Sequence, residues 1–185
     1  MSDHEPNESM LVCTARRGDK DALQTLLKRN WGWLKSLAYS VLANRQDVDD
    51  VMQEICVRVI TRIHTLREPE RFRAWLAILA RNVAIRHHRR RLPIVAATEE
   101  LGYVGDPAVD AERKELCDRV LEVVNELPRK YREVFVLAHS GELTYAQMAE
   151  VLDVPITTMQ IRLVRARQMV RSQIASVSEQ KVREI

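Results

Sequence analysis

Acidic and amide side chains gather in the stretch DVDDVMQEICVRVITR, residues 47–62. Positions three and four apart are neighbours on a helix, so one face of this stretch would carry Asp49, Asp50, Gln53 and Glu54. Asp50 and Glu54 are like charges one turn apart, which costs an isolated helix roughly a few tenths of a kcal/mol. Three uses are open to this face: a solvated surface, a divalent-metal site, or a docking surface for a basic partner. No histidine shares the face, which disfavours the metal site.

A second group of side chains is basic and lies at the C-terminal end of the stretch RFRAWLAILARNVAIRHHRRR, residues 71–91. The first half of the stretch is mostly apolar. The second half carries one amide, Asn82, and a run of basic side chains: Arg81, Arg86, His87, His88, Arg89, Arg90 and Arg91. The helix dipole favours cations near a C-terminus, but cations at this density repel one another unless a polyanion neutralises them. We therefore predict a phosphate-binding patch. His87 and His88 point to different faces and have no third ligand nearby, so no metal site is expected.

A third group lies in TYAQMAEVLDVPITTMQIRLVRARQMVR, residues 144–171. Thr144 and Gln147 have the spacing of a capping box, which satisfies free N–H groups at a helix start. Pro155 interrupts the helical pattern, and a second helix restarts after it. The outer face of this second helix carries Thr158, Ile161, Arg162, Arg165 and Gln168. Two short helices around a tight turn are typical of a helix-turn-helix that enters a DNA major groove, although such units also occur as plain structural corners.

The composition of the whole chain indicates that helices hold these groups in place. Only 5 Gly and 6 Pro in 185 residues favour long helices over a turn-rich β protein, and 46% hydrophobic residues suffice for buried cores. The net charge is only +3, so attraction to phosphate must come from local clusters. Cys13, Cys56 and Cys117 lie far apart, which fits reduced thiols rather than a disulfide framework or a zinc site. An acidic N-terminus and the lack of a long apolar run predict a soluble cytoplasmic protein without a signal peptide or membrane insertion.

Helical spacing of the apolar residues predicts the buried faces. The longest run starts after Asp19, a candidate N-cap, and includes Trp31, for which we expect core and boundary packing. Three further buried stripes are expected: Val48, Val51, Met52, Ile55, Val59 and Ile60; Phe72, Trp75, Leu76, Leu79 and Val83; and, in the helix-turn-helix, Tyr145, Met148, Val151, Leu152, Ile156, Met159, Leu163, Ala166 and Val170. The polar tail after Ser172 is expected to fray.

The stretch at residues 93–110 separates the chain into two parts. It shows no sustained periodicity, contains Gly102, Gly105 and Pro107, and is acidic, which is typical of a linker. The prediction is an all-α protein of two small helical domains joined by a flexible linker. The N-terminal domain would span residues 8–92. The C-terminal domain, residues 111–175, would add helices at 111–126 and 128–140 to the helix-turn-helix.

In order and content these parts resemble the extracytoplasmic-function (ECF) family of bacterial RNA polymerase sigma factors, over about residues 19–173. DVDDVMQEICVRVI is similar to the polymerase-docking helix of the family, which usually contains D-x-x-Q-E. FRAWLAILARNVAIRHHRR is similar to its helix for the promoter −10 element. LPRKYREVFVLAHSGELTYAQMAEVLDVPITTMQIRLVRAR is similar to its −35-reading domain.

The resemblance implies a partner for each group of side chains. Asp49, Asp50, Gln53 and Glu54 would meet a basic coiled coil of the largest subunit of core RNA polymerase. In promoter DNA, Asn82 would contact a base edge of the −10 element and Arg81, Arg86, Arg89 and Arg90 its phosphates. The loop at 64–71 would border a pocket for a base flipped from the non-template strand. The −35 contacts would come from Thr158, Gln160, Ile161, Arg162 and Arg165. A sigma factor is not an enzyme and needs no cofactor, and an anti-sigma factor is a further candidate partner.

The recognition helix departs from the family pattern. Where the family commonly has G-T-V-K-S-R, this chain has TTMQIR, so that Gln160 stands for a lysine and Ile161 for a serine. An amide suits adenine and an apolar group suits a thymine methyl, so we predict an unusual −35 sequence.

Two other functions stay open on the residues alone. One is a dimeric helix-turn-helix regulator that acts without polymerase docking, although a repressor has no need of a second basic helix beside an acidic face. The other is a nuclease that uses Asp49, Asp50 and Glu54 with a metal, although no nucleophile–base pair or Gly-rich phosphate loop accompanies these carboxylates.

Overall fold

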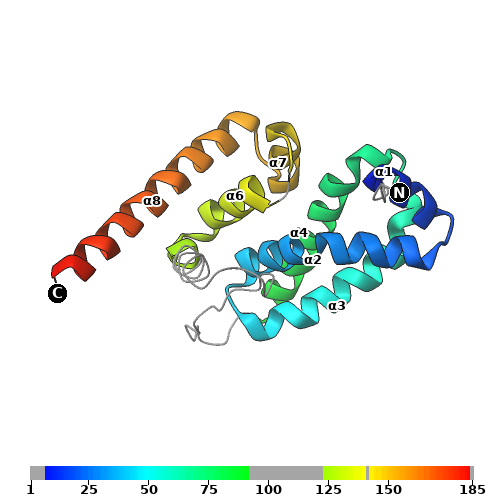
Figure 1. Ribbon diagram of the computed structural model, residues 1–185, viewed down its shortest axis with the longest axis horizontal. Helices are drawn as coiled ribbons and strands as arrows, with labels where there is room; N and C mark the ends of the chain where they lie inside the picture. The colour runs from blue at the N-terminus through cyan, green and yellow to red at the C-terminus, as the bar shows by residue number, and fades with distance from the viewer. Residues whose placement is uncertain (1–6, 92–122, 141, 184–185) are drawn as a thin grey trace, which may run out of the picture.

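The computed structural model describes residues 7–91, 123–140 and 142–183, and this part of the chain is helical with no β-strand (Figure 1). The N-terminal half contains α1 (Glu8–Arg16), α2 (Lys20–Leu42), α3 (Arg45–Arg62) and α4 (Phe72–Arg91), with the short 3-10 turns η1 (Ile63–Thr65) and η2 (Pro69–Arg71) before α4. The C-terminal half contains α6 (Arg129–Ser140), α7 (Tyr145–Leu152) and α8 (Ile156–Arg183). The all-α prediction is confirmed. The predicted linker, and the helix predicted at 111–126 apart from residues 123–126, lie outside the described residues.

Each of the first three helices begins at a side chain that accepts hydrogen bonds from free backbone N–H groups. Asn7 accepts from Ser9 N at 3.3 Å, and Asn44 accepts from Gln46 N at 2.9 Å. Asp19 Oδ1 accepts from Asp21 N at 2.9 Å and from Ala22 N at 3.0 Å. Such caps stabilise a helix by about 1 kcal/mol each, so the sequence sets where these helices start. The prediction of Asp19 as an N-cap is confirmed.

The core of the N-terminal half lies where α2 packs against α1, α3 and α4. The predicted stripe of α3 is buried from Val48 to Val59, but the prediction for Ile60 is wrong, because this side chain is 55% exposed. The chain leaves the α-helix two residues later, and Ile63 and Leu66 of the following turn take the buried positions instead.

The two tryptophans of α2 have different surroundings. Trp31 is 39% exposed, so it lies at the boundary of the core rather than inside it. Trp33 packs against the core instead and donates from Nε1 to Oδ1 of the fully buried Asn30 at 2.7 Å. Asn30 also donates to the carbonyl of Leu26 at 2.8 Å. A buried amide needs hydrogen-bond partners, and the indole N–H supplies one.

The helix-turn-helix forms as predicted. Thr144 N donates to Gln147 Oε1 at 2.9 Å and Gln147 N donates to Thr144 Oγ1 at 3.2 Å, which completes the capping box of α7. Asp153 ends α7 in the left-handed region at φ 55°. The predicted inner face is buried in both helices: Met148, Val151, Leu152, Met159, Leu163, Ala166 and Val170.

Two residues of that predicted face are not buried. Tyr145 is 46% and Ile156 is 41% exposed, so these predictions are wrong. Each is the first residue of its helix, where the neighbouring helix gives little cover. The expected fraying after Ser172 is also wrong, because α8 continues to Arg183. No glycine or proline follows Pro155, so no strong helix breaker stops α8 earlier.

The two halves of the chain pack against each other. Helix α6 lies on α2, and α7 lies on α4 (Figure 1). Buried side chains of both halves form one continuous apolar cluster. Helix α4 is therefore covered on more than one side, and small residues are buried along it at Ala77, Ala80 and Ala84 beside the larger predicted ones. None of the described helices is long and apolar enough to cross a membrane.

Candidate docking face and nucleic-acid groove

The acidic face of α3 points to solvent and is partly paired. Asp49, Asp50 and Gln53 are exposed, and Asp49 Oδ1 lies 3.1 Å from Lys35 Nζ of α2. Glu54 is half-buried and accepts from Arg58 Nε at 2.9 Å and from Arg58 Nη2 at 2.5 Å. Arg58 thus offsets the repulsion between Asp50 and Glu54, which sequence reading treated as uncompensated.

Apolar side chains extend this acidic face toward the end of α3. Val57 is 59% and Ile60 is 55% exposed. We use the name docking face for Asp49, Asp50, Gln53, Glu54, Val57 and Ile60. Sequence analysis missed the last two because it read Ile60 as buried and gave Val57 no role. An exposed apolar pair beside carboxylates is typical of a protein-binding surface rather than of a solvated helix face.

A groove of about 530 Å³ lies between α3 and α4. Its wall is made by five arginines (Arg58, Arg62, Arg86, Arg89 and Arg90), by Thr65 and Asn82, and by the apolar Trp75, Ile78, Leu79 and Ile85. Among the residues that the structure describes, no carboxylate lines it. Arginines that can bind phosphates beside an aromatic ring that can stack on a base are the combination that binds single-stranded nucleic acid.

The groove brings together most of the residues predicted for the −10 element. Asn82, Arg86, Arg89 and Arg90 are all exposed and all line it. The groove is also lined by residues to which sequence analysis gave no role, above all Arg58, Arg62 and Trp75. These could have been found only by knowing that α3 and α4 lie side by side, since Arg58 and Trp75 belong to different helices. From the loop predicted to border a flipped base, Thr65 lines the groove.

Arg81 is the predicted −10 residue that does not line the groove. Its side chain is 16% exposed, and its Nε lies 2.6 Å from Oε2 of Glu133 on α6. Glu133 is 2% exposed and also accepts from Arg129 Nε at 2.7 Å. Arg81 is therefore bound to the C-terminal half of the chain, not to the arginine cluster with which the sequence grouped it.

The two histidines of α4 also separate. His87 Nε2 lies 3.6 Å from Oδ1 of the buried Asp47 at the start of α3. Burial, together with the nearby Arg129, lowers the pKa of His88 below its ordinary value. His88 thus adds no charge to the basic end of α4 at neutral pH. Among the described residues no group of three or more His, Cys, Asp or Glu side chains could hold a metal ion.

The outer face of the recognition helix α8 is open. Gln160, Ile161 and Arg165 are exposed, whereas Thr158 and Arg162 are half-buried. Val164 is 54% exposed between them and was missed. Interaction with Arg165 lowers the pKa of Tyr131 on α6, so this tyrosine lies close to one of the predicted −35 arginines. Donors, an amide and apolar groups on one exposed helix are what major-groove readout requires.

The described residues thus form an all-α protein with an arginine-lined groove and a helix-turn-helix. Two family models match the chain: Sigma-70 region 2 at residues 26–92 and Sigma-70, region 4 at residues 117–170.

Curated relatives extend this match over most of the chain. It is 28% identical to the ECF RNA polymerase sigma factor SigW of Bacillus subtilis, over 86% of this chain and 92% of the relative. It is 29% identical to the ECF RNA polymerase sigma-E factor of Haemophilus influenzae, over 90% of this chain and 95% of the relative. The chain belongs to the ECF family of RNA polymerase sigma factors, as its motifs predicted.

Two solved structures share the fold. One is CnrH in complex with the cytosolic domain of CnrY, with a TM-score of 0.65 and 26% identity, covering 91% of this chain and 97% of CnrH. The other is the sigma factor RpoE of Bartonella quintana in complex with the anti-sigma factor NepR, with a TM-score of 0.71 and 18% identity, covering 85% of this chain and 98% of RpoE.

Membership of this family fixes the function. The chain is a transcription initiation factor that binds core RNA polymerase and directs initiation at specific promoters. It is not an enzyme, so the carboxylates of α3 have no catalytic role. A dimeric regulator that acts without polymerase is not favoured, since the chain matches both sigma regions.

Proposed function

We propose that the three surfaces divide the work of initiation. The docking face of α3 binds a basic surface of core RNA polymerase, the groove between α3 and α4 binds the opened −10 element, and the outer face of α8 reads the −35 duplex. The domain at residues 8–92 carries the first two tasks, and the domain at 111–175 carries the third. The protein acts in the cytoplasm, where RNA polymerase works.

The arginine groove is the observation that carries this proposal. Five arginines line the groove beside apolar side chains that include Trp75, and no carboxylate of the described residues lines it. Phosphates of a single strand would lie against the arginines, and a base stacked on Trp75 would contribute about 1–3 kcal/mol. Asn82 at the edge of the groove has an amide that can both donate and accept at a base edge.

A matched pair of substitutions tests the division of labour. Asn82→Ala should weaken open-complex formation on a fork template that carries only a single-stranded −10 element, because it removes the base contact in the groove. Gln160→Ala should leave that template unaffected and should weaken binding to a duplex −35 element. Both are measured with the variant assembled on core RNA polymerase. Equal losses for both variants on both templates would contradict the assignment.

The amino acids of α8 set the −35 preference. Gln160 and Ile161 are both exposed, so both can reach base edges. Restoring the common family residues by Gln160→Lys with Ile161→Ser should shift the sequences selected from random DNA toward the common family −35 consensus. If the native chain already selects that consensus, the proposed readout by Gln160 and Ile161 is wrong.

An anti-sigma factor is proposed as a third class of partner. Two chains with this fold were solved in complexes, CnrH with the cytosolic domain of CnrY and RpoE with the anti-sigma factor NepR. Such a partner would have to cover the docking face or hold the two halves of the chain together. Affinity purification from the native host under non-inducing conditions, with and without competing core polymerase, tests this.

A further inference from the structure

Helix α1 packs against the loop that joins α3 to α4. The loop contains the turns η1 and η2, and α1 contacts both of them. Leu11, Val12 and Ala15 of α1 are buried in the same apolar cluster as Ile63 and Leu66 of the loop. Helix α1 precedes the region 2 match, which begins at residue 26. The loop is therefore supported by a helix that lies outside the matched region.

Two polar contacts connect α1 to this loop and to the residues just after it. Arg16 Nη1 donates to the carbonyl oxygen of Arg67 at 3.4 Å, in the middle of the loop. Glu8 Oε2 accepts from Nε of Arg73 at 2.9 Å, in the first turn of α4. Helix α1 thus holds the loop at one point along its course and again where α4 begins.

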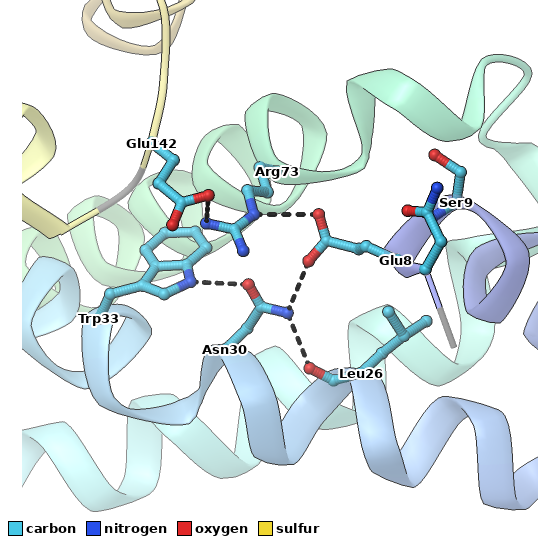
Figure 2. Close-up of polar contacts among 8 residues, drawn as sticks. Glu8, Ser9, Leu26, Asn30, Trp33, Arg73 and Glu142 are labelled. Atoms are coloured by element: carbon cyan, nitrogen blue, oxygen red, sulfur yellow. Dashed lines mark hydrogen bonds and ion pairs between the residues drawn. The ribbon is translucent and has the colours of Figure 1, made fainter. Parts of the chain in front are cut away.

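Figure 2 shows how Glu8 is itself held in place. Its carboxylate lies between Arg73 and Asn30, and it accepts from Asn30 Nδ2 at 3.4 Å. Asn30 is fully buried and accepts from Trp33 Nε1 at 2.7 Å. Arg73 Nη1 also lies 3.0 Å from Glu142 Oε2, but the Glu142 side chain is 81% exposed, so this pair is weak. A buried amide with several partners is rigid, and it fixes the carboxylate that orients Arg73.

The same loop and the first turn of α4 form one end of the arginine groove. Arg62, Thr65 and Trp75 line the groove there, on either side of the loop. The Trp75 ring is stacked on the ring of the fully buried Phe72, with 6.1 Å between the centroids and 29° between the planes. Phe72 lies directly after η2 and directly before Arg73. A shift of the loop or of Arg73 would therefore move Phe72 and, with it, the Trp75 ring.

A base stacks well only on a ring that is already in position. Ordering a mobile side chain on binding lowers the affinity by about two- to tenfold. We propose that α1 is the positioning element for this end of the groove, and that Glu8 and Arg16 are positioning residues that fix the loop and thereby the Trp75 ring. The affinity part of this proposal rests on the proposed −10 role of the groove; the placement of Trp75 by α1 does not.

Fluorine NMR of the free chain, labelled with 5-fluorotryptophan, measures the placement of Trp75 without DNA. Trp75→Phe identifies its signal. Glu8→Ala with Arg16→Ala should shift and broaden this signal, because the ring then samples several positions. Thr14→Ala is the matched control in α1, since its hydroxyl donates to the carbonyl of Met10 in the same helix at 2.8 Å, and it should leave the signal unchanged. An unchanged Trp75 signal in the double variant would overturn the proposal.

Two further signals separate loss of placement from loss of folding. Trp31 is 39% exposed on α2, and its signal should stay in place in the double variant. Glu8→Gln keeps one oxygen that can accept from Arg73, so it should move the Trp75 signal less than Glu8→Ala does. If the Trp31 signal moves as far as the Trp75 signal, α1 supports the whole N-terminal half rather than the groove, and the proposal is wrong.

A double-mutant cycle on the holoenzyme measures the effect on binding. The affinity for a labelled single-stranded −10 oligonucleotide is compared among variants assembled on core polymerase. Glu8→Ala should lower this affinity about two- to tenfold when Trp75 is present. It should have no effect in a Trp75→Ala background, because the effect passes through the ring. An equal loss in both backgrounds would refute the proposal, since a purely structural role of Glu8 would weaken binding in both.

Trp75→Ala alone separates this proposal from the proposed function. If Trp75→Ala binds the oligonucleotide as tightly as the wild type, while Glu8→Ala with Arg16→Ala displaces the Trp75 signal, α1 positions the ring and the stacking role of Trp75 fails. If Trp75→Ala weakens binding while the α1 double variant leaves the Trp75 signal in place, the stacking role stands and the positioning by α1 fails.

Discussion

Removing arginines from the groove should change the salt dependence of −10 binding by a predictable amount. Each phosphate neutralised on a single strand contributes about −0.7 to the slope of log K against log salt concentration. Five arginines line the groove, so together they contribute about −3.5 if each binds one phosphate. Between 50 and 200 mM salt, this slope alone lowers the affinity about 130-fold.

The perturbation is Arg86→Ala, alone and with Arg89→Ala. The slope should become less steep by about 0.7 for the single and about 1.4 for the double variant. The groove contribution to the loss of affinity between 50 and 200 mM salt then falls to about 20-fold in the double variant. Arg17→Ala is the control, because Arg17 follows α1 and does not line the groove.

The assay is fluorescence anisotropy of a labelled single-stranded −10 oligonucleotide with the sigma factor assembled on core polymerase. Other phosphate contacts of the holoenzyme add to every slope equally, so the difference between variant and wild type is the quantity to compare. If the double variant keeps the wild-type slope, the arginines do not bind phosphates and the groove is not the −10 site.

Three other substitutions test the docking face, the helix-turn-helix and the basic end of α4. Asp50→Lys with Glu54→Lys reverses the charge of the docking face and should abolish binding to core polymerase. Circular dichroism should stay unchanged, because Asp50 is exposed and Glu54 is only half-buried. Thr144→Ala should lower the free energy of unfolding by about 1 kcal/mol in urea denaturation, because it removes the capping box of α7. The unfolded chain binds a proton at His88 more tightly than the folded chain, whose pKa is lowered from 6.5. The free energy of unfolding should therefore fall as the pH drops below about 6.5, and His88→Gln should flatten this fall in thermal melts.

Each of these three substitutions has a control variant or a result that would contradict it. Glu126→Lys reverses an exposed charge outside the docking face and should leave polymerase binding intact; unaltered binding by the α3 double variant would remove the docking role from this face. Thr25→Ala removes a hydroxyl that donates to the carbonyl of Asp21, one turn earlier in its own helix, and should cost less than Thr144→Ala. An identical pH dependence with and without His88 would show that another group titrates.

Local features of the fold could be predicted from the sequence. Caps at Asp19 and Thr144 and the buried face from Met148 to Val170 depend on neighbours within a few residues, so spacing alone identifies them. Predictions for side chains near helix ends were wrong. Ile60 and Tyr145 follow the helical period, yet the covering helix or the helix itself ends there.

Features that join distant segments could not be predicted. Arg58 and Trp75 line one groove only because α3 and α4 lie side by side. Arg81 was grouped with the other arginines of its helix, but its position on α4 turns it toward Glu133 of α6. A carboxylate far along the chain leaves no local mark on the sequence around Arg81. The packing of the two halves against each other could not be predicted for the same reason, since the sequence shows only that a linker connects them.

Run-off transcription with purified core RNA polymerase over a pool of promoters tests the central claim most directly. The wild-type chain should direct initiation at a restricted set of promoters that share a −10 and an unusual −35 element. The groove double variant should lose this activity while still binding core polymerase. If the purified chain directs no promoter-specific initiation, and instead binds a palindromic duplex by itself as a dimer, the account is contradicted.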